Sequence, residues 1–216
     1  MLAIFDVEGV LFDAEYLPLL AEKVNKEEKI WKITRQGIEG VINWEEGLMA
    51  RVNALRGMSY ETCQQVADSL PIMTGARTAC RALKTAGWKI LAISGGFTIM
   101  TDRLQRELNL DYVYSNELIF RDGKLDGVEI NVGADKALPA RKKIHEWGER
   151  REDIVVTVDG ANDLKLFDIC GLGIAFRAQD VVKDAADIVL EKKDLSGILG
   201  IIKRHYNVAL ENPPIA

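Results

Sequence analysis

The residues best suited to chemistry in this sequence are acids, a serine and a lysine. Three of them directly follow short apolar runs: Asp6, Ser94 and Asp159. Phosphoryl transfer needs a carboxylate to attack phosphorus, a divalent cation to neutralise the phosphate, and cationic or hydroxyl groups for its oxygens. The sequence offers these parts in Asp6, Glu8, Ser94, Lys136, Asp159 and Asp163. Oxygen ligands without clustered His or Cys favour Mg²⁺ over zinc.

Strand–turn–helix units are expected to position these residues. The runs 1–5, 89–93 and 154–158 each have the length and apolar character of a buried strand, and helical patterns follow them. Such repetition is typical of an α/β fold with a doubly wound, mainly parallel sheet. Ligands bind beyond the carboxyl ends of the strands in such sheets, so we expect Asp6, Ser94 and Asp159 to converge there.

A different pattern separates the first strand from the second. Residues 14–72 show helical periodicity and almost no strand signal. We interpret them as a small helical cap inserted into a catalytic core of residues 1–13 and 73–216. Within that core, Asp122-Gly123 lies between two alternating runs in 118–130 and predicts a β-hairpin.

Each residue alone has an ordinary structural explanation, as a turn former, helix cap or solvated side chain. Their order is more specific. The tracts Asp6–Leu11 (DVEGVL), Ile93–Gly96 (ISGG), Lys136 and Val158–Asp163 (VDGAND) together resemble the four motifs of the haloacid dehalogenase superfamily. The resemblance covers nearly the whole chain and implies the Rossmann-like core of that superfamily.

The resemblance also implies roles for these residues. Asp6 would become an aspartyl phosphate, and Glu8 would donate and accept the proton. Asp159 would bind Mg²⁺ together with Asp6 and the backbone carbonyl of Glu8, with Asp163 supporting the metal from behind. The remaining catalytic residues, Ser94 and Lys136, would hold the phosphoryl oxygens.

Within the superfamily, the sequence is most similar to the phosphoserine phosphatases. The tracts Ser94–Phe97 (SGGF), Asn116–Gly127 and Asp159–Asp163 carry this likeness, as do the small helical cap and, within it, Ile33-Thr34 with Glu39-Gly40. The resemblance implies L-phosphoserine as the substrate, in the last step of serine synthesis. It assigns the substrate ammonium to Glu15, the substrate carboxylate to Arg51, and other contacts to Ile38, Trp44, Ser94, Gly95 and Asn162.

One position departs from the phosphatase pattern. Glu8 stands where that family has Asp, and the extra methylene moves the carboxyl group by roughly 1 Å, a displacement that can cost on the order of 100-fold in rate. The tract Asp6–Leu11 also resembles the phosphoserine:homoserine phosphotransferases, which have Glu there. Three alternatives therefore remain: a phosphotransferase, a phosphatase for another small phosphate ester, and a silent binding protein.

Composition narrows the class of partner. The 28 basic and 33 acidic residues give a net charge of −5, which argues against binding to nucleic acid or an anionic membrane surface. The three scattered cysteines predict buried thiols rather than disulfides or a zinc site. We expect a cytoplasmic monomer or homodimer that takes a small phosphate ester.

Overall fold

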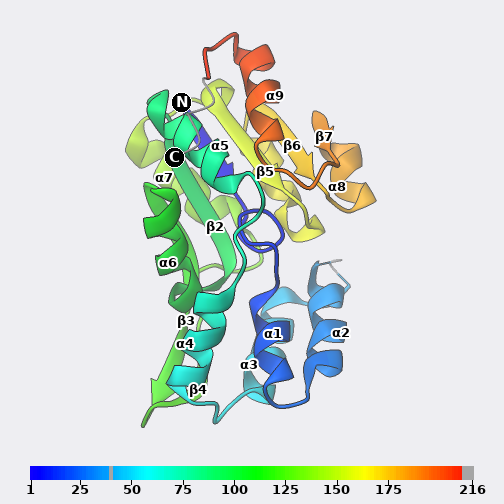
Figure 1. The fold of residues 1–216 in the computed structure, drawn as a ribbon. Helices are drawn as coiled ribbons and strands as arrows, with labels where there is room; N and C mark the ends of the chain where they lie inside the picture. Colours follow the sequence, from blue (N-terminus) through cyan, green and yellow to red (C-terminus); the bar gives the residue numbers. More distant parts are fainter. Residues whose placement is uncertain (39–40, 211–216) are drawn as a thin grey trace.

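The computed structural model describes residues 1–38 and 41–210 and contains a seven-stranded sheet (Figure 1). The strand order is β4-β3-β2-β1-β5-β6-β7, and all pairs are parallel except β3 with β4. The predicted α/β fold with a mainly parallel sheet is therefore confirmed. The strands are β1 (Leu2–Phe5), β2 (Lys89–Phe97), β3 (Tyr112–Arg121), β4 (Lys124–Glu129), β5 (Ile154–Val158), β6 (Leu172–Phe176) and β7 (Ile188–Leu190).

Helices cover both faces of this sheet. Alternate residues of β1 enter two separate apolar clusters: Ala3 and Phe5 join the cluster that includes α5, α6 and α9, while Leu2 and Ile4 join that of α7, η2 and α8. The helices of the core are α5 (Ala76–Thr85), α6 (Thr98–Leu108), α7 (Ala137–Trp147), the 3₁₀ segments η1 (Arg151–Asp153) and η2 (Ala161–Ile169), α8 (Asp180–Ala185) and α9 (Gly197–Tyr206).

The register of the central strands brings their carboxyl ends to one edge. Phe5 of β1 pairs with Ala92 of β2 on one side and with Thr157 of β5 on the other. One residue beyond this row, Asp6 N donates to Thr157 O at 3.1 Å. Asp6, Ser94 and Asp159 therefore lie near one another at the carboxyl edge of the central strands, as the sequence predicts.

In the described part of the chain, four helices lie between β1 and α5, and the chain enters and leaves them through paired segments. The helices are α1 (Tyr16–Glu22), α2 (Glu27–Ile38), α3 (Trp44–Ala54) and α4 (Tyr60–Ser69). Asp13 N donates to Pro71 O at 2.9 Å, and Met73 N donates to Leu11 O at 2.8 Å. These hydrogen bonds hold the incoming and outgoing segments against each other.

Arg103 of α6 connects these incoming and outgoing segments to the core. Its guanidinium donates to carbonyl oxygens at the end of α4, including Leu70 O at 2.5 Å, and lies over the ring of Phe12 at 5.3 Å. Phe12 belongs to the incoming segment and Leu70 begins the outgoing one. One side chain thus contacts both segments.

The β3–β4 hairpin reaches from the sheet to the inserted helices (Figure 1). Asp122 and Gly123 form its turn with φ of +50° and +70°, which confirms the hairpin predicted from this dipeptide. Gly57 N donates to Leu125 O, and Tyr60 N donates to Gly123 O, each at 2.8 Å. The turn between α3 and α4 is therefore hydrogen-bonded to the core.

The end of β2 differs from the sequence prediction, whereas the state of the cysteines agrees with it. β2 continues through Ser94, Gly95 and Gly96 to Phe97 with an irregular register, although the sequence predicts that the strand ends at Ile93. The expected buried thiols are confirmed, since Cys63, Cys80 and Cys170 are all free and buried.

Among residues 1–38 and 41–210, no helix is both long enough and apolar enough to cross a lipid bilayer.

Gly75, directly before α5, packs closely against the segment that precedes α9. Its φ is +80°, and a Cβ there would lie 2.2 Å from Asp194 Oδ1 and 2.4 Å from Ser196 N. Gly87 has nearly the same φ, +79°, but no heavy atom within 4 Å of a Cβ. We expect Gly87→Ala to cost about 1–2 kcal/mol of unfolding free energy from backbone strain alone. Gly75→Ala should cost a further ~1–3 kcal/mol because its Cβ also displaces neighbours.

Urea unfolding followed by circular dichroism measures both losses. Equal destabilisation by the two substitutions would show that the close contact between Gly75 and the start of α9 does not contribute to the free energy of unfolding.

Candidate active site

A buried lysine joins two of the acids at the carboxyl edge of the sheet. Lys136 Nζ lies 2.7 Å from Asp6 Oδ1 and 2.7 Å from Asp163 Oδ1. Lys136 precedes α7, Asp6 follows β1, and Asp163 lies in η2. Asp6 Oδ1 also accepts a hydrogen bond from Val7 N at 2.7 Å. Both interactions fix the plane of the Asp6 carboxylate.

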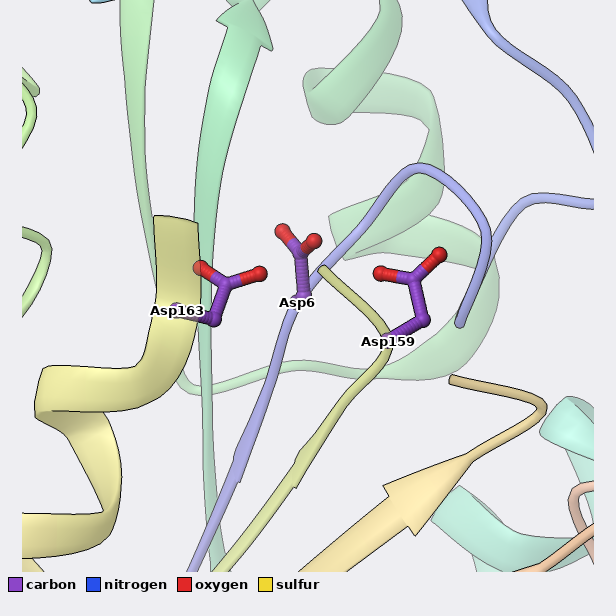
Figure 2. Close-up of side chains that lie close together, drawn as sticks. All are labelled: Asp6, Asp159 and Asp163. Atoms are coloured by element: carbon purple, nitrogen blue, oxygen red, sulfur yellow. The ribbon is translucent and has the colours of Figure 1, made fainter. Parts of the chain in front are cut away.

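Asp159 completes a group of three carboxyl groups. Oxygen atoms of Asp6, Asp159 and Asp163 lie within 4.8 Å of one another. Figure 2 shows the Asp6 carboxyl group between the other two. Gly9 makes room for this arrangement, because its φ is +81° and a Cβ there would lie 2.1 Å from Asp159 Oδ2. Any other residue at position 9 would displace the Asp159 side chain.

The three acids fit a divalent cation. Asp163 is fully buried, its Oδ2 has no hydrogen-bond partner among the described residues, and its Oδ1 meets Lys136 without hydrogen-bond alignment. Buried carboxylate oxygens without partners are costly unless a cation or a proton compensates them. Oxygen donors alone suit a hard cation such as Mg²⁺. The site therefore has the charge and ligand chemistry of a divalent-metal site.

Burial and mutual repulsion control the ionisation of this group in the metal-free protein. Burial, together with the charge of Asp6, raises the pKa of Asp159 to about 8. The same causes raise the pKa of Asp163 well above its usual range. Burial disfavours the charged form of Lys136, but Asp163 and Asp6 outweigh it and raise the Lys136 pKa. The lysine stays charged and the acids compete for protons or a cation.

The segment Ser94–Gly96 forms the next part of the site. Ser94 is fully buried, and its Oγ accepts a hydrogen bond from Gly96 N at 2.9 Å. The buried Asn116 side chain supports the segment, since its Nδ2 donates to Gly95 O at 2.9 Å. Its Oδ1 accepts from the backbone N–H groups of Asn131 and Val132. Asn116 therefore holds Gly95 in place from the side of β3.

Glu8 is held by the first residue of α1. Its Oε1 accepts a hydrogen bond from Tyr16 N at 2.7 Å. The Tyr16 hydroxyl donates to Cys63 O of α4, and its ring meets Phe97 edge-on at 5.8 Å. Burial raises the pKa of Glu8, with repulsion from Asp6 adding to the effect. Glu8 is thus a positioned carboxyl group with a strengthened tendency to hold a proton.

The inserted helices supply the opposite wall of the cavity. Arg51 of α3 donates from Nε to Gly47 O at 3.1 Å and from Nη1 to Thr34 Oγ1 at 3.2 Å. Glu15 lies immediately before α1, and burial next to the charge of Glu8 raises its pKa well above the usual range. Burial lowers the pKa of Arg51, and the glutamates oppose that shift.

Trp44 contacts the core directly. A Cβ on Gly95 would lie 2.8 Å from Trp44 Cζ2, so the indole lies against the backbone of the Ser94–Gly96 segment. The cavity is therefore bounded by the core on one side and by the inserted helices on the other.

Most of the residues selected from the sequence line this one cavity. They are Asp6, Glu8, Glu15, Trp44, Arg51, Gly95, Lys136, Asp159 and Asn162. Ser94 and Asp163 are not on its wall and lie buried behind it. The side chain of Ile38 lies outside the described part of the structure, although Ile38 ends α2.

Several lining residues have no site role predicted from the sequence, and of these Thr34, which enters there only through the phosphatase likeness, is the one with a polar side chain. Thr34 is 1% exposed and lies one turn after the buried Ile30 on α2. A hydroxyl on the apolar stripe of an amphipathic helix is the signal that would have identified it. The others are Leu17, Gly37, Leu48, Gly96 and Phe97.

Comparison with known proteins gives consistent results. A phosphoserine phosphatase of Methanocaldococcus jannaschii is 37% identical over 207 residues, which cover 94% of this chain and 97% of that protein. A phosphoserine phosphatase of Archaeoglobus fulgidus is 36% identical over 205 residues. The match covers 94% of this chain and 60% of the Archaeoglobus protein, so the chain corresponds to only part of that relative.

Solved structures agree with these relatives. A phospho-aspartyl intermediate analogue of phosphoserine phosphatase and a substrate-bound phosphoserine phosphatase each superpose with a TM-score of 0.89. They are 36% and 34% identical, and each match covers 93% of this chain and 97% of the other. The family model for haloacid dehalogenase-like hydrolases matches residues 3–168, more than half of the sequence. The chain belongs to the haloacid dehalogenase-like hydrolase family.

Proposed function

We propose that this protein hydrolyses L-phosphoserine to L-serine and phosphate in a Mg²⁺-dependent reaction through a phosphorylated Asp6. The observation that carries this proposal is the cavity itself. A carboxylate fixed by Lys136 faces, in the same cavity, an acid at Glu15 and a guanidinium at Arg51. The relatives and structures named above are phosphoserine phosphatases, which supports the same substrate.

Glu15 and Arg51 match the two charged groups of an amino acid. A substrate ammonium group beside Glu15 would stabilise the ionised carboxylate, which burial and the nearby acids otherwise disfavour by raising the Glu15 pKa. A carboxylate would accept parallel hydrogen bonds from the Arg51 guanidinium. A phosphate ester that carries both groups on one carbon is an α-amino acid phosphate, and phosphoserine is the simplest of these.

A divalent cation is needed to bring a phosphate here. Among the residues that the structure describes, five carboxyl groups but only two cationic side chains, Lys136 and Arg51, surround the site. We assign the cation to the carboxylates of Asp6 and Asp159 and the backbone carbonyl of Glu8, with Asp163 supporting them. When bound, Mg²⁺ would neutralise phosphate charge and polarise the phosphorus centre.

Asp6 begins the reaction. Its Oδ1 already accepts hydrogen bonds from Lys136 and Val7 N, which leaves Oδ2 to attack phosphorus. The new Asp6 O–P bond forms as the P–O bond to the seryl oxygen breaks, and Glu8 gives its proton to that oxygen. Lys136 and the Ser94 hydroxyl would stabilise the phosphoryl oxygens.

Glu8 reverses its role in the second half. Now ionised, it removes a proton from a water molecule whose oxygen attacks phosphorus. The bond between Asp6 and phosphorus breaks and inorganic phosphate leaves, so that Asp6 and protonated Glu8 are restored. The hydrogen bond from Tyr16 N keeps the Glu8 carboxyl in one place during both halves.

We also propose that residues 14–72 act as a cap on a core formed by residues 1–13 and 73–216. The paired segments at Asp13–Pro71 and Leu11–Met73 support these limits. The cap supplies Arg51 and Trp44, while the core supplies the acids. Movement of the cap would admit substrate and then exclude bulk water.

Phosphate release from L-phosphoserine in Mg²⁺ is the direct test. We expect faster release than from other small phosphate esters, and no release with a chelator. Arg51→Ala should lower kcat/KM for phosphoserine by roughly 10- to 100-fold, the weight of a hydrogen-bonded charge pair. The same variant should barely affect O-phosphoethanolamine, which lacks the carboxylate.

Arg35→Ala is the matched control, since Arg35 is exposed on α2 outside the cavity. Absence of phosphate release from wild-type protein would contradict the hydrolase proposal. Serine formation that depends on added homoserine would instead indicate the phosphotransferase, for which Glu8 is the favouring residue.

Metal binding can be measured through stability. At a Mg²⁺ concentration 100 times its Kd, we expect about 2.7 kcal/mol of stabilisation and a higher Tm. Asp159→Asn should abolish this shift without lowering the metal-free Tm, because it removes one of three repelling acids. Asp180→Asn on the exposed face of α8 should retain the full shift. An equal Mg²⁺ shift in all three proteins would place the cation elsewhere.

Glu8→Gln separates proton transfer from metal binding. We expect kcat to fall by about 10²–10⁴-fold, because the amide cannot exchange a proton with the seryl oxygen or water. The Mg²⁺-dependent rise in Tm should remain, since the proposed metal contact is a backbone carbonyl. Glu22→Gln, an exposed change at the end of α1, is the control for kinetics. Unchanged turnover in Glu8→Gln would assign the proton to another group.

A further inference from the structure

The orientation of Arg51 depends on two different helices. Its Nε donates to Gly47 O, one turn earlier on α3, and its Nη1 donates to the hydroxyl of Thr34 on α2. Arg51 and Thr34 both line the cavity, together with Glu15. The guanidinium is therefore held at Nε and at one Nη1 hydrogen, while the other Nη1 hydrogen and both on Nη2 remain for a ligand.

Thr34 is an unusual residue for its place on α2. It is 1% exposed and follows the buried Ile30 by one helical turn, where an aliphatic side chain would satisfy packing. A buried hydroxyl is costly without a partner, and its oxygen is partnered by Arg51 at 3.2 Å. Packing alone therefore does not account for a hydroxyl at this position.

We propose that Thr34 is a specificity-determining positioning residue, which fixes Arg51 so that the Nη1–Nη2 edge meets the substrate carboxylate. This inference rests on the proposed function and adds a residue to it. Thr34 acts through Arg51 rather than on the reacting atoms. Without the hydroxyl, Arg51 would keep only its bond to Gly47 O and would sample several orientations.

A second contact between the same helices supports this role. Lys26 Nζ, next to the start of α2, donates to Ala54 O at the end of α3, at 2.6 Å. The two helices are thus joined near their outer ends by Lys26 and at the cavity by Thr34. Removal of the Thr34 contact would leave the helices joined, so its effect should appear in substrate recognition rather than in folding.

Thr34→Val is the informative substitution because it removes the hydroxyl and nearly keeps the side-chain volume. We expect KM for L-phosphoserine to rise by roughly 10-fold or more, as for loss of a hydrogen bond to a charged group, with little change in kcat. O-phosphoethanolamine, which has no carboxylate, should be turned over as by the wild type. Thr34→Ser should restore recognition because it keeps the oxygen.

A double-mutant cycle tests whether Thr34 acts through Arg51. In an Arg51→Ala background, Thr34→Val should have no further effect on phosphoserine turnover. Thr85→Val, an exposed change on α5, is the control for loss of a threonine hydroxyl. Urea unfolding of each variant shows that the comparison is made between folded proteins.

The outcomes separate this inference from the function on which it rests. A wild-type enzyme that fails to hydrolyse phosphoserine would overturn the proposed function and, with it, the role of Thr34 toward a carboxylate. If the wild type is active, equal losses on both substrates would reduce Thr34 to a packing residue. No loss on either substrate, or full additivity with Arg51→Ala, would also overturn the inference.

Discussion

The ion pairs of Lys136 with Asp6 and Asp163 are the interactions on which the site depends. The lysine is 4% exposed, and burial of a charge at this depth is tolerated only with close partners. Its partners are far apart in the sequence, Asp6 directly after β1 and Asp163 in η2, so the pairs form only when the fold brings these segments together. Loss of the lysine would leave clustered acids without their nearest cation. Fold stability and the orientation of the Asp6 carboxylate are therefore coupled at one ammonium group.

The two walls of the cavity are held by different parts of the fold. Asp6 and Asp159 directly follow buried parallel strands, Asp163 lies in η2, and Lys136 precedes α7, so all four are held by elements of the sheet and its covering helices. Arg51 and Trp44 instead lie on inserted helices that the chain enters and leaves through one hydrogen-bonded crossing. A rigid group of acids suits a cation, whose ligands must keep their distances. The inserted helices contact the core at Gly95, at Phe97, through Arg103 and through the β3–β4 hairpin, and they form the part of the cavity wall opposite the acids.

The sequence predicted the parts of this arrangement that depend on local pattern. Apolar runs predicted β1, β5 and the parallel sheet, and Asp122-Gly123 predicted the hairpin. Both predictions succeed because strand burial and turn geometry are properties of short segments. The predicted end of β2 at Ile93 was wrong, because backbone pairing with β3 continues the strand through Ser94–Gly96 to Phe97. The contact of Thr34 with Arg51 was not predicted, because it depends on how α2 and α3 pack, which periodicity does not specify. The functional roles of the site residues, including Glu15 and Asn162, stay predictions.

Glu8 shows how a longer side chain is accommodated at the position where the resemblance to the phosphoserine phosphatases implies Asp. The extra methylene places the carboxyl group farther from the backbone than that of Asp. In this position the carboxyl group accepts a hydrogen bond from the N–H of Tyr16. Tyr16 is itself fixed, through its hydroxyl to α4 and through its ring to Phe97 beside the Ser94–Gly96 segment. The carboxyl position is therefore set jointly by the core and the first inserted helix. Because an anchored acid avoids the loss of rate that misplacement brings, the length of Glu8 is compatible with efficient proton transfer in both halves of the proposed reaction.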